Sequence, residues 1–225
     1  MTLSETLDTI IDGAHAANDQ FLTLSGGASV GEYGIEPFVS SNIAMRLWKT
    51  MNAHKGEIPA NQPELTKFAV TLETPFWEIA DEAGSRRAGR PVARFSQGER
   101  VDVVVWNGDN RPIGVVEVKR DFSFPAMRKD IDRISHLLAK HGHSAGGSLK
   151  WGSIVGLRAV WGESPRAPET VLGDFVSKLE SCDELSNMNF RERHRSQRLD
   201  HPNEYEGRKF WGFDAFAIIF RMKRA

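Results

Sequence analysis

The sequence has few of the features that mark secreted, fibrous or membrane proteins. Its single cysteine, Cys182, cannot form an internal disulfide, which favours a reducing compartment. No apolar run approaches the ~20 residues that cross a bilayer, and the first residues lack the basic and apolar segments of a secretory signal. The net charge of −1 provides no global attraction for nucleic acid or an anionic membrane. These absences predict a soluble, cytoplasmic protein with no membrane partner.

What is present is the composition of a globular chain. Of the 225 residues, 40% are hydrophobic and 26% are charged. A chain of this length can bury roughly 70% of the surface that it exposes when unfolded. We expect one globular unit, residues 35–225, preceded by an N-terminal helical extension, residues 1–34.

Periodicity places helices and strands in alternation. Apolar spacing predicts helices over 3–22, 37–52, 125–141 and 168–181, the first opened by a capping box between Thr2 and Glu5. Apolar runs predict strands over 101–106, 113–119, 152–161 and 210–220, and residues 68–79 are rich in strand formers, with Pro75 interrupting them. Helices flanking a group of strands predict an α/β (α+β) fold with a central mixed β-sheet.

Two of these strands form a hairpin that carries charge where charge is costly. Turn-forming residues 107–112 join strands that are apolar on both faces, as in strands covered on each side. An ionised carboxylate there is unfavourable unless it is paired or bound to metal, yet the strands contain Asp102 and Glu117. A turn centred on Asp109 and Asn110 would set these two carboxylates opposite each other, with Cβ atoms roughly 4.5–5.5 Å apart. A turn on Asn107 and Gly108 would separate them.

Lys119 projects from the same face of its strand as Glu117, because strand side chains alternate. Converging carboxylate oxygens suit Mg²⁺ or Mn²⁺ rather than zinc. A lysine beside such an ion could orient an attacking water or stabilise negative charge that develops on a phosphoryl group. A plainer interpretation is that Glu117 and Lys119 form a surface ion pair at a strand end.

Asp102, a hairpin turn and then Glu117-Val118-Lys119 resemble the PD-(D/E)xK nuclease superfamily, which has the restriction-endonuclease-like fold. The resemblance covers roughly residues 36–160 and implies a metal-dependent hydrolase that cleaves nucleic-acid phosphodiester bonds. It implies that Asp102, Glu117 and the carbonyl of Val118 bind Mg (or Mn) and that Lys119 assists hydrolysis. Val101 stands where the named motif has proline, so only the aspartate of that half is present.

The resemblance also implies a glutamate from a preceding helix near the site. Glu36 is the best match, with Glu73 and Glu78 as alternatives. The segment from Arg128 to Ile134 is similar to the family's helix after the ExK strand.

The expected partner is nucleic acid, with DNA favoured over RNA, and a homodimer is compatible with the resemblance. A basic stretch in a poorly periodic segment provides the candidate contacts Arg191, Arg193, Arg195 and Arg198. We interpret this stretch as either a solvated loop or a surface that follows a phosphate backbone. Arg86, Arg87 and Arg90 form a second, weaker patch. The rival hypotheses are a catalytically inactive module of the same fold that binds nucleic acid or a protein partner, and an immunity or assembly protein that acts through protein contacts alone.

The glycines of residues 26–34 do not form a phosphate-binding P-loop, because no Gly-Lys-Ser/Thr follows them. We interpret this glycine-rich loop as a connector.

Overall fold

The structure, a computed structural model, describes residues 1–53, 67–84 and 98–223. The helices are α1 (Leu3–Ser25), α2 (Val30–Tyr33), α3 (Glu36–Asn52), α4 (Phe76–Glu82), α5 (Phe124–His141) and α6 (Pro168–Glu180), with short 3₁₀ turns η3 (His143–Ala145) and η4 (Asp183–Leu185). The strands are β1 (Phe68–Pro75), β2 (Arg100–Asn107), β3 (Pro112–Lys119), β4 (Trp151–Trp161), β5 (Met188–Tyr205) and β6 (Arg208–Met222).

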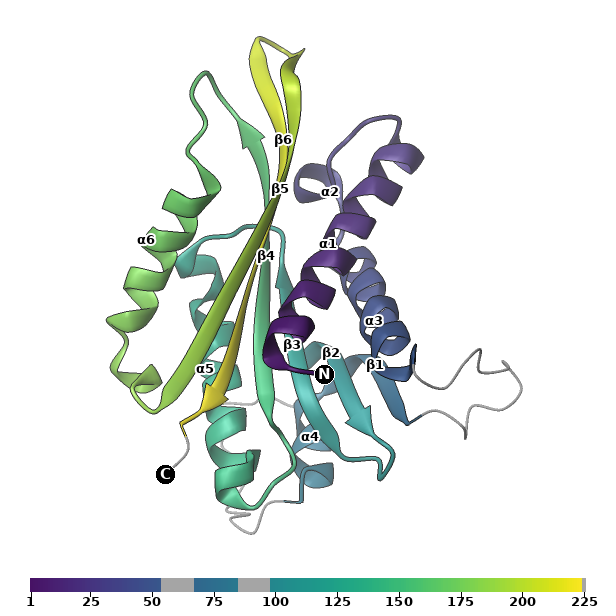
Figure 1. Cartoon of the computed structure of the whole chain (residues 1–225), viewed down its shortest axis with the longest axis vertical. Helices are drawn as coiled ribbons and strands as arrows, with labels where there is room; N and C mark the ends of the chain where they lie inside the picture. The colour runs from purple at the N-terminus through teal and green to yellow at the C-terminus, as the bar shows by residue number, and fades with distance from the viewer. Residues whose placement is uncertain (54–66, 85–97, 224–225) are drawn as a thin grey trace, which may run out of the picture.

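The six strands form one mixed sheet in the order β1-β2-β3-β4-β6-β5. Strands β3 and β4 are parallel, and the other neighbouring pairs are antiparallel. A parallel pair needs a crossover connection, and α5 provides it. The predicted class, a mixed sheet flanked by helices, is therefore confirmed (Figure 1).

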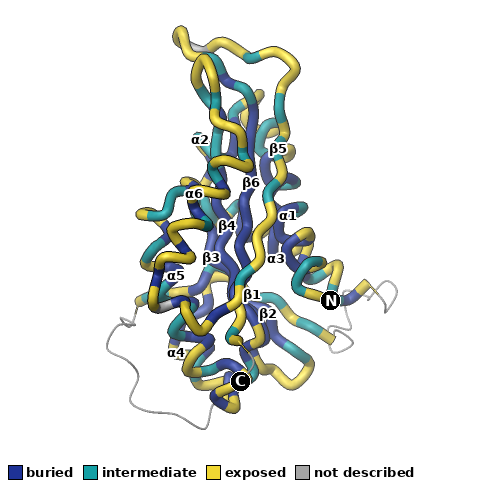
Figure 2. Tube along the Cα trace, turned by 60° about the vertical axis from the view of Figure 1, so that its left-hand side comes forward, coloured by how far each residue is buried: buried dark blue, intermediate teal, exposed yellow. Residues whose placement is uncertain are grey.

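Helices cover both faces of the sheet and form two apolar cores. The first core joins α1 and α3 to one face, and residues 1–34 contribute Leu7, Ile10 and Val30 to it. The second core joins α4, α5 and α6 to the other face, through side chains such as Ile131 and Phe175. Figure 2 shows the resulting contrast between the buried central strands and the exposed end of the β5–β6 hairpin. Strands β2, β3 and β4 are thus covered on both sides, as their apolar runs predict.

The predicted capping box is confirmed, and the structure decides between the two hairpin registers that the sequence left open. The Thr2 side chain accepts the N–H of Glu5 at 3.2 Å, and the Glu5 carboxylate accepts the N–H of Thr2 at 2.7 Å. In the hairpin, Val103 pairs with Val116, which is the register of a turn centred on Asp109 and Asn110. No helix in the described part of the chain is long and apolar enough to cross a membrane.

The turn chemistry explains why this register is adopted. The Asn107 side chain accepts the N–H groups of Asp109 and Arg111 at 3.1 and 2.9 Å, which closes a longer loop than a two-residue Asn-Gly turn. Asn110 takes the left-handed conformation, with φ of 55°, which asparagine tolerates better than most residues. A bulge between Val105 and Trp106 absorbs the extra residue.

Two predicted segments differ from the structure. Strand β1 ends at Pro75, and the strand formers that follow it belong to α4, because proline has no N–H for the strand ladder and suits a helix start. The basic stretch around Arg191–Arg198, for which a solvated loop was one interpretation, lies within β5. Arg86, Arg87, Arg90 and most of the predicted loop 53–64 lie outside the described residues.

Candidate functional site

The candidate site lies where β2 begins and β3 ends, between the start of α3 and the face of α5. Asp102 is in β2, and Glu117 and Lys119 are in β3. Glu36 is the first residue of α3, and Asp130 and Arg133 lie on α5. Four elements therefore contribute side chains to a cluster that only the tertiary fold assembles.

Asp102 and Glu117 are neighbours across the hairpin. Paired residues end at Val103 and Val116, and the same register continued by one step sets Asp102 against Glu117. Asp102 Oδ2 accepts the N–H of Val118 at 2.6 Å, which ties the carboxylate to the end of β3. The Glu117 side chain is 2% exposed. The sequence-based expectation that these carboxylates converge therefore agrees with their placement.

Burial acts on both carboxylates in the same direction. Loss of solvent raises the pKa of Asp102, and the N–H of Val118 opposes that rise. Loss of solvent and the nearby charge of Asp102 hold the pKa of Glu117 well above its ordinary value, despite the Arg133 guanidinium. A further cation beside these two adjacent carboxylates would stabilise their ionised forms and lower both pKa values.

Lys119 is held between two carboxylates. Its Nζ lies 3.3 Å from Asp130 Oδ2 and 3.9 Å from Glu36 Oε2. Burial alone would lower the pKa of Lys119, but the charges of Asp130 and Glu36 outweigh it and raise that pKa. Lys119 is therefore a cation at neutral pH, suited to donate hydrogen bonds and balance negative charge.

Of the three upstream glutamates, Glu36 makes direct contact with the cluster. Besides its ion pair with Lys119, its Oε1 accepts the N–H of Arg120 at 3.2 Å. The charge of Glu73 adds to the rise in the pKa of Asp102 that burial causes. Glu78 lies within α4.

The sequence interpretation did not single out Asp130, Arg133 or Glu99, which surround the predicted residues. The Nη2 atom of Arg133 lies 3.0 Å from Glu117 Oε1 and also contacts the Asp130 carboxylate. The Nη1 atom of Arg133 lies 3.8 Å from Glu99 Oε2. One signal was present. Asp130 occupies an inward position of α5, three residues after Met127 and four before Ile134, where an apolar side chain is expected.

The donor chemistry of the cluster fits a hard divalent cation. Asp102, Glu117 and the carbonyl of Val118 provide oxygen ligands of the kind that Mg²⁺ binds. Across residues 1–53, 67–84 and 98–223, no three or more His, Cys, Asp or Glu side chains are grouped closely enough to hold a metal by themselves. Mg²⁺ commonly keeps several waters and takes only one or two carboxylates from the protein, so two carboxylates are compatible with it.

The four candidate nucleic-acid contacts lie on β5, and three of them already have carboxylate partners. Arg193 and Arg195 pair with Asp8 and Asp12 of α1. Arg198 pairs with the buried Asp214 of β6. Arg191 is exposed. Three of the four arginines would therefore exchange a carboxylate partner for a phosphate on binding nucleic acid.

Comparison of the chain with protein-family models, with curated proteins and with solved structures finds no match. The likeness to the PD-(D/E)xK nucleases therefore depends on the residues of the site themselves.

Proposed function

We propose that the chain is a divalent-metal-dependent nuclease that hydrolyses phosphodiester bonds of nucleic acid, with DNA favoured over RNA. The observation that carries this proposal is the adjacency of the buried carboxylate of Glu117 and the partly buried carboxylate of Asp102, whose pKa values loss of solvent raises, beside the cationic Lys119. Buried like charges are unfavourable for folding alone and favourable where a cation and a phosphate are to be bound.

Each residue then has a distinct role. Asp102, Glu117 and the Val118 carbonyl would hold Mg²⁺ or Mn²⁺, which when bound neutralises phosphoryl charge and lowers the pKa of a water. Lys119 orients the attacking water and stabilises the charge that develops on the phosphoryl oxygens. Glu36 and Asp130 hold the Lys119 ammonium group in place through their carboxylates.

The test is cleavage of labelled duplex DNA, single-stranded DNA and RNA in Mg²⁺, Mn²⁺ and EDTA. We expect metal-dependent cutting that Lys119→Ala removes, because the variant lacks the cation beside the reacting phosphate. Lys49→Ala, which removes an exposed lysine at the end of α3, is the matched control and should cut like the wild type. Equal cutting by both variants would exclude the assigned role of Lys119.

One observation favours a second candidate function, a module of the same fold that binds nucleic acid or a protein partner without cutting. The guanidinium of Arg133 already lies against the buried carboxylate of Glu117 and offsets part of the cost of its burial without any metal. Binding of nucleic acid in the same assay with no turnover in either metal would favour this module over the nuclease.

A further inference from the structure

A pocket of about 410 Å³ lies at the end of β4, outside the carboxylate site. The glycine-rich loop that follows α1, together with α2, forms one wall of this pocket. The end of β4 and the β5–β6 hairpin form the other wall. Its volume lies within the range typical of small-ligand sites, about 300–1,000 Å³.

The loop wall presents backbone to the pocket. Gly26 and Gly27 have φ values of 72° and 119°, and a Cβ added at either position would meet no atom within 4 Å. Residues without side chains at an open wall let a flat ligand approach the main chain closely.

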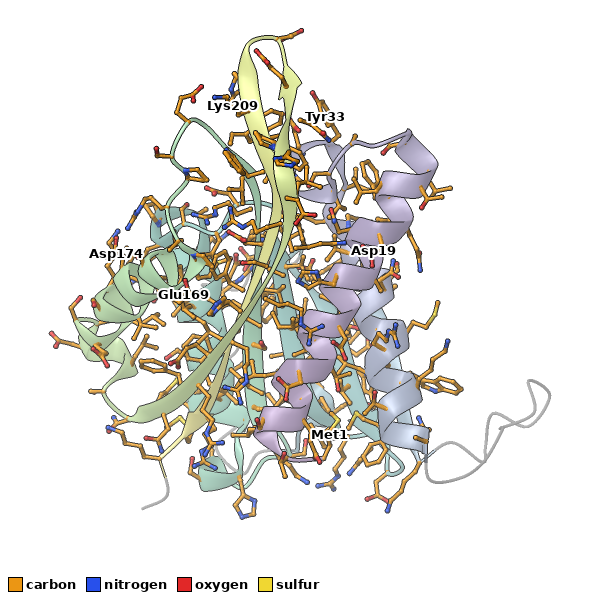
Figure 3. The ribbon with its side chains drawn as sticks, turned by 45° about the horizontal axis from the view of Figure 1, so that its top comes forward. Met1, Asp19, Tyr33, Glu169, Asp174 and Lys209 are labelled. Carbon is orange, nitrogen blue, oxygen red and sulfur yellow. The ribbon has the colours of Figure 1, made fainter. Side chains whose placement is uncertain are left out.

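The hairpin wall is aromatic and carries one cation. The guanidinium of Arg208 lies over the ring of Trp161, 5.0 Å from its centroid, and the ring of Phe210 lies 4.9 Å from the same ring. Tyr33, which also lines the pocket, is 67% exposed. Figure 3 shows Tyr33 on α2, beside the β5–β6 hairpin. Phe210 is buried and Trp161 is half-buried, so Tyr33 offers the exposed ring of the pocket. Unpaired bases stack on such rings, and arginine adds to the attraction.

The acidic residues of the pocket favour binding of a base over binding of a phosphate. Glu32 and Glu206 line the pocket beside Arg208. Carboxylates repel phosphate oxygens but accept hydrogen bonds from the amino groups of bases. A nucleotide in this pocket would therefore place its base inside and its phosphates outside.

The pocket is joined to the carboxylate site by a short stretch of chain. Ser29, Glu32 and Tyr33 line the pocket. The next residue, Gly34, accepts a hydrogen bond from Arg120 at 3.5 Å, and Glu36 then contacts Lys119. A nucleic-acid strand bound both in the pocket and at the carboxylate site would follow the segment from Ser29 to Glu36.

We propose that this aromatic pocket binds an unpaired base of the nucleic-acid strand whose phosphodiester is placed at Lys119. The inference rests on the proposed function, which makes the bound strand the nucleic acid that the chain cleaves. It assigns a single-stranded segment, in DNA or RNA, as the preferred substrate, because a base inside a duplex has no free face for the pocket.

The test measures binding without cleavage. Fluorescently labelled single-stranded DNA, the same sequence as RNA and the same sequence as a blunt duplex are titrated in EDTA. We expect the single strands to bind more tightly than the duplex. Trp161→Ala and Tyr33→Ala should each weaken single-strand binding by about 5-fold to 100-fold, the effect typical of losing one stacking partner. Tyr33→Ala is the safer variant for folding because its side chain is exposed.

The matched control is Trp77→Ala, which removes a tryptophan that is 59% exposed on α4, at the opposite end of the molecule (Figure 1). It should bind like the wild type. Unchanged binding by both pocket variants, a preference for the duplex, or no binding of any strand would overturn the proposal. Cleavage in Mg²⁺ and Mn²⁺ is scored separately, so a nuclease that binds its strand elsewhere is distinguished from a chain that does not cut.

Discussion

At the scale of single residues, the charge of Glu117 depends strongly on its surroundings. Its carboxylate is buried against the charge of Asp102, and its pKa is raised well above the ordinary value of 4.5. The folded chain therefore holds a proton at pH values where the unfolded chain has lost it. Without metal, the stability that this proton provides is present below pH 4.5 and is lost as pH rises through the raised pKa.

Glu117→Gln removes this titration and keeps the shape of the side chain. In EDTA, the free energy of unfolding of the wild type, relative to the variant, should fall as pH rises from 4.5 into the neutral range. Urea denaturation at a series of pH values measures the difference. A difference that is constant with pH would contradict the raised pKa of Glu117.

Asp130 belongs to the same scale, as a positioning residue for Lys119. Asp130→Asn removes the nearer of the two carboxylate charges around the Lys119 ammonium group. We expect cleavage to fall about 10-fold to 100-fold, as is typical when the partner that orients a site residue is lost. The effect should fall on kcat, and the basic limb of the pH–rate profile should move to lower pH because the pKa of Lys119 falls.

Asp132→Asn is the control for that prediction. Asp132 lies on the same helix, where it pairs with Arg128 on the more exposed side of α5. Its loss should leave kcat and the pH profile unchanged. Equal effects of the two variants would mean that Asp130 acts through helix stability rather than through Lys119.

At the scale of elements, β5 shows how a polar segment becomes a strand. One side of β5 faces α1, where Gln197 donates to Asp19 at 3.0 Å, and the other faces α6, where His194 lies 3.3 Å from Glu169. Figure 3 labels both acidic residues on their helices. Because polar side chains of α1 and α6 contact the two sides of β5, this strand has no alternation of apolar and polar residues. Its sequence therefore resembles that of a loop.

The ion pairs of β5 differ in their contribution to stability. Asp214 of β6 is fully buried and accepts hydrogen bonds from Arg158, Arg198 and Ser196. Asp214→Ala should lower the free energy of unfolding by about 3–5 kcal/mol, because it removes the buried carboxylate that pairs with two partly buried arginines.

Asp8→Ala removes an exposed pair with Arg193 and should cost no more than about 1 kcal/mol. Urea denaturation of both variants tests the contrast between the two pairs. Similar losses would mean that burial does not distinguish them.

At the scale of the whole molecule, metal binding and folding are linked. An ion that binds only the folded chain adds about 2.7 kcal/mol at a hundred times its Kd, or about 5–10 °C in Tm for a chain of this size. We expect Mn²⁺ or Mg²⁺ to raise Tm, Asp102→Asn to abolish the rise, and Glu78→Gln on α4 to retain it. Thermal unfolding with and without metal measures the shift, and an equal rise in Asp102→Asn would place the ion elsewhere.

Much of the fold was predictable because its signals are local. The capping box at Thr2 and Glu5, the helical spacing of α5 and the apolar runs of β2 and β3 each depend on residues close together in the chain. The hairpin itself followed from the same kind of signal, but its register did not, since the sequence left two turns open and the structure decided between them. Asp102, Glu117 and Lys119 were identifiable because charge on such strands is unexpected.

The sequence alone therefore determined the hairpin, its three charged residues and most of the helices. The tertiary structure alone decided that β5 is a strand, that Glu36 rather than Glu78 contacts Lys119, and that Asp130 and Arg133 surround the site. The physical reason is distance along the chain. An ion pair between residues far apart leaves no periodic trace in either segment, so only the folded chain shows which charges meet.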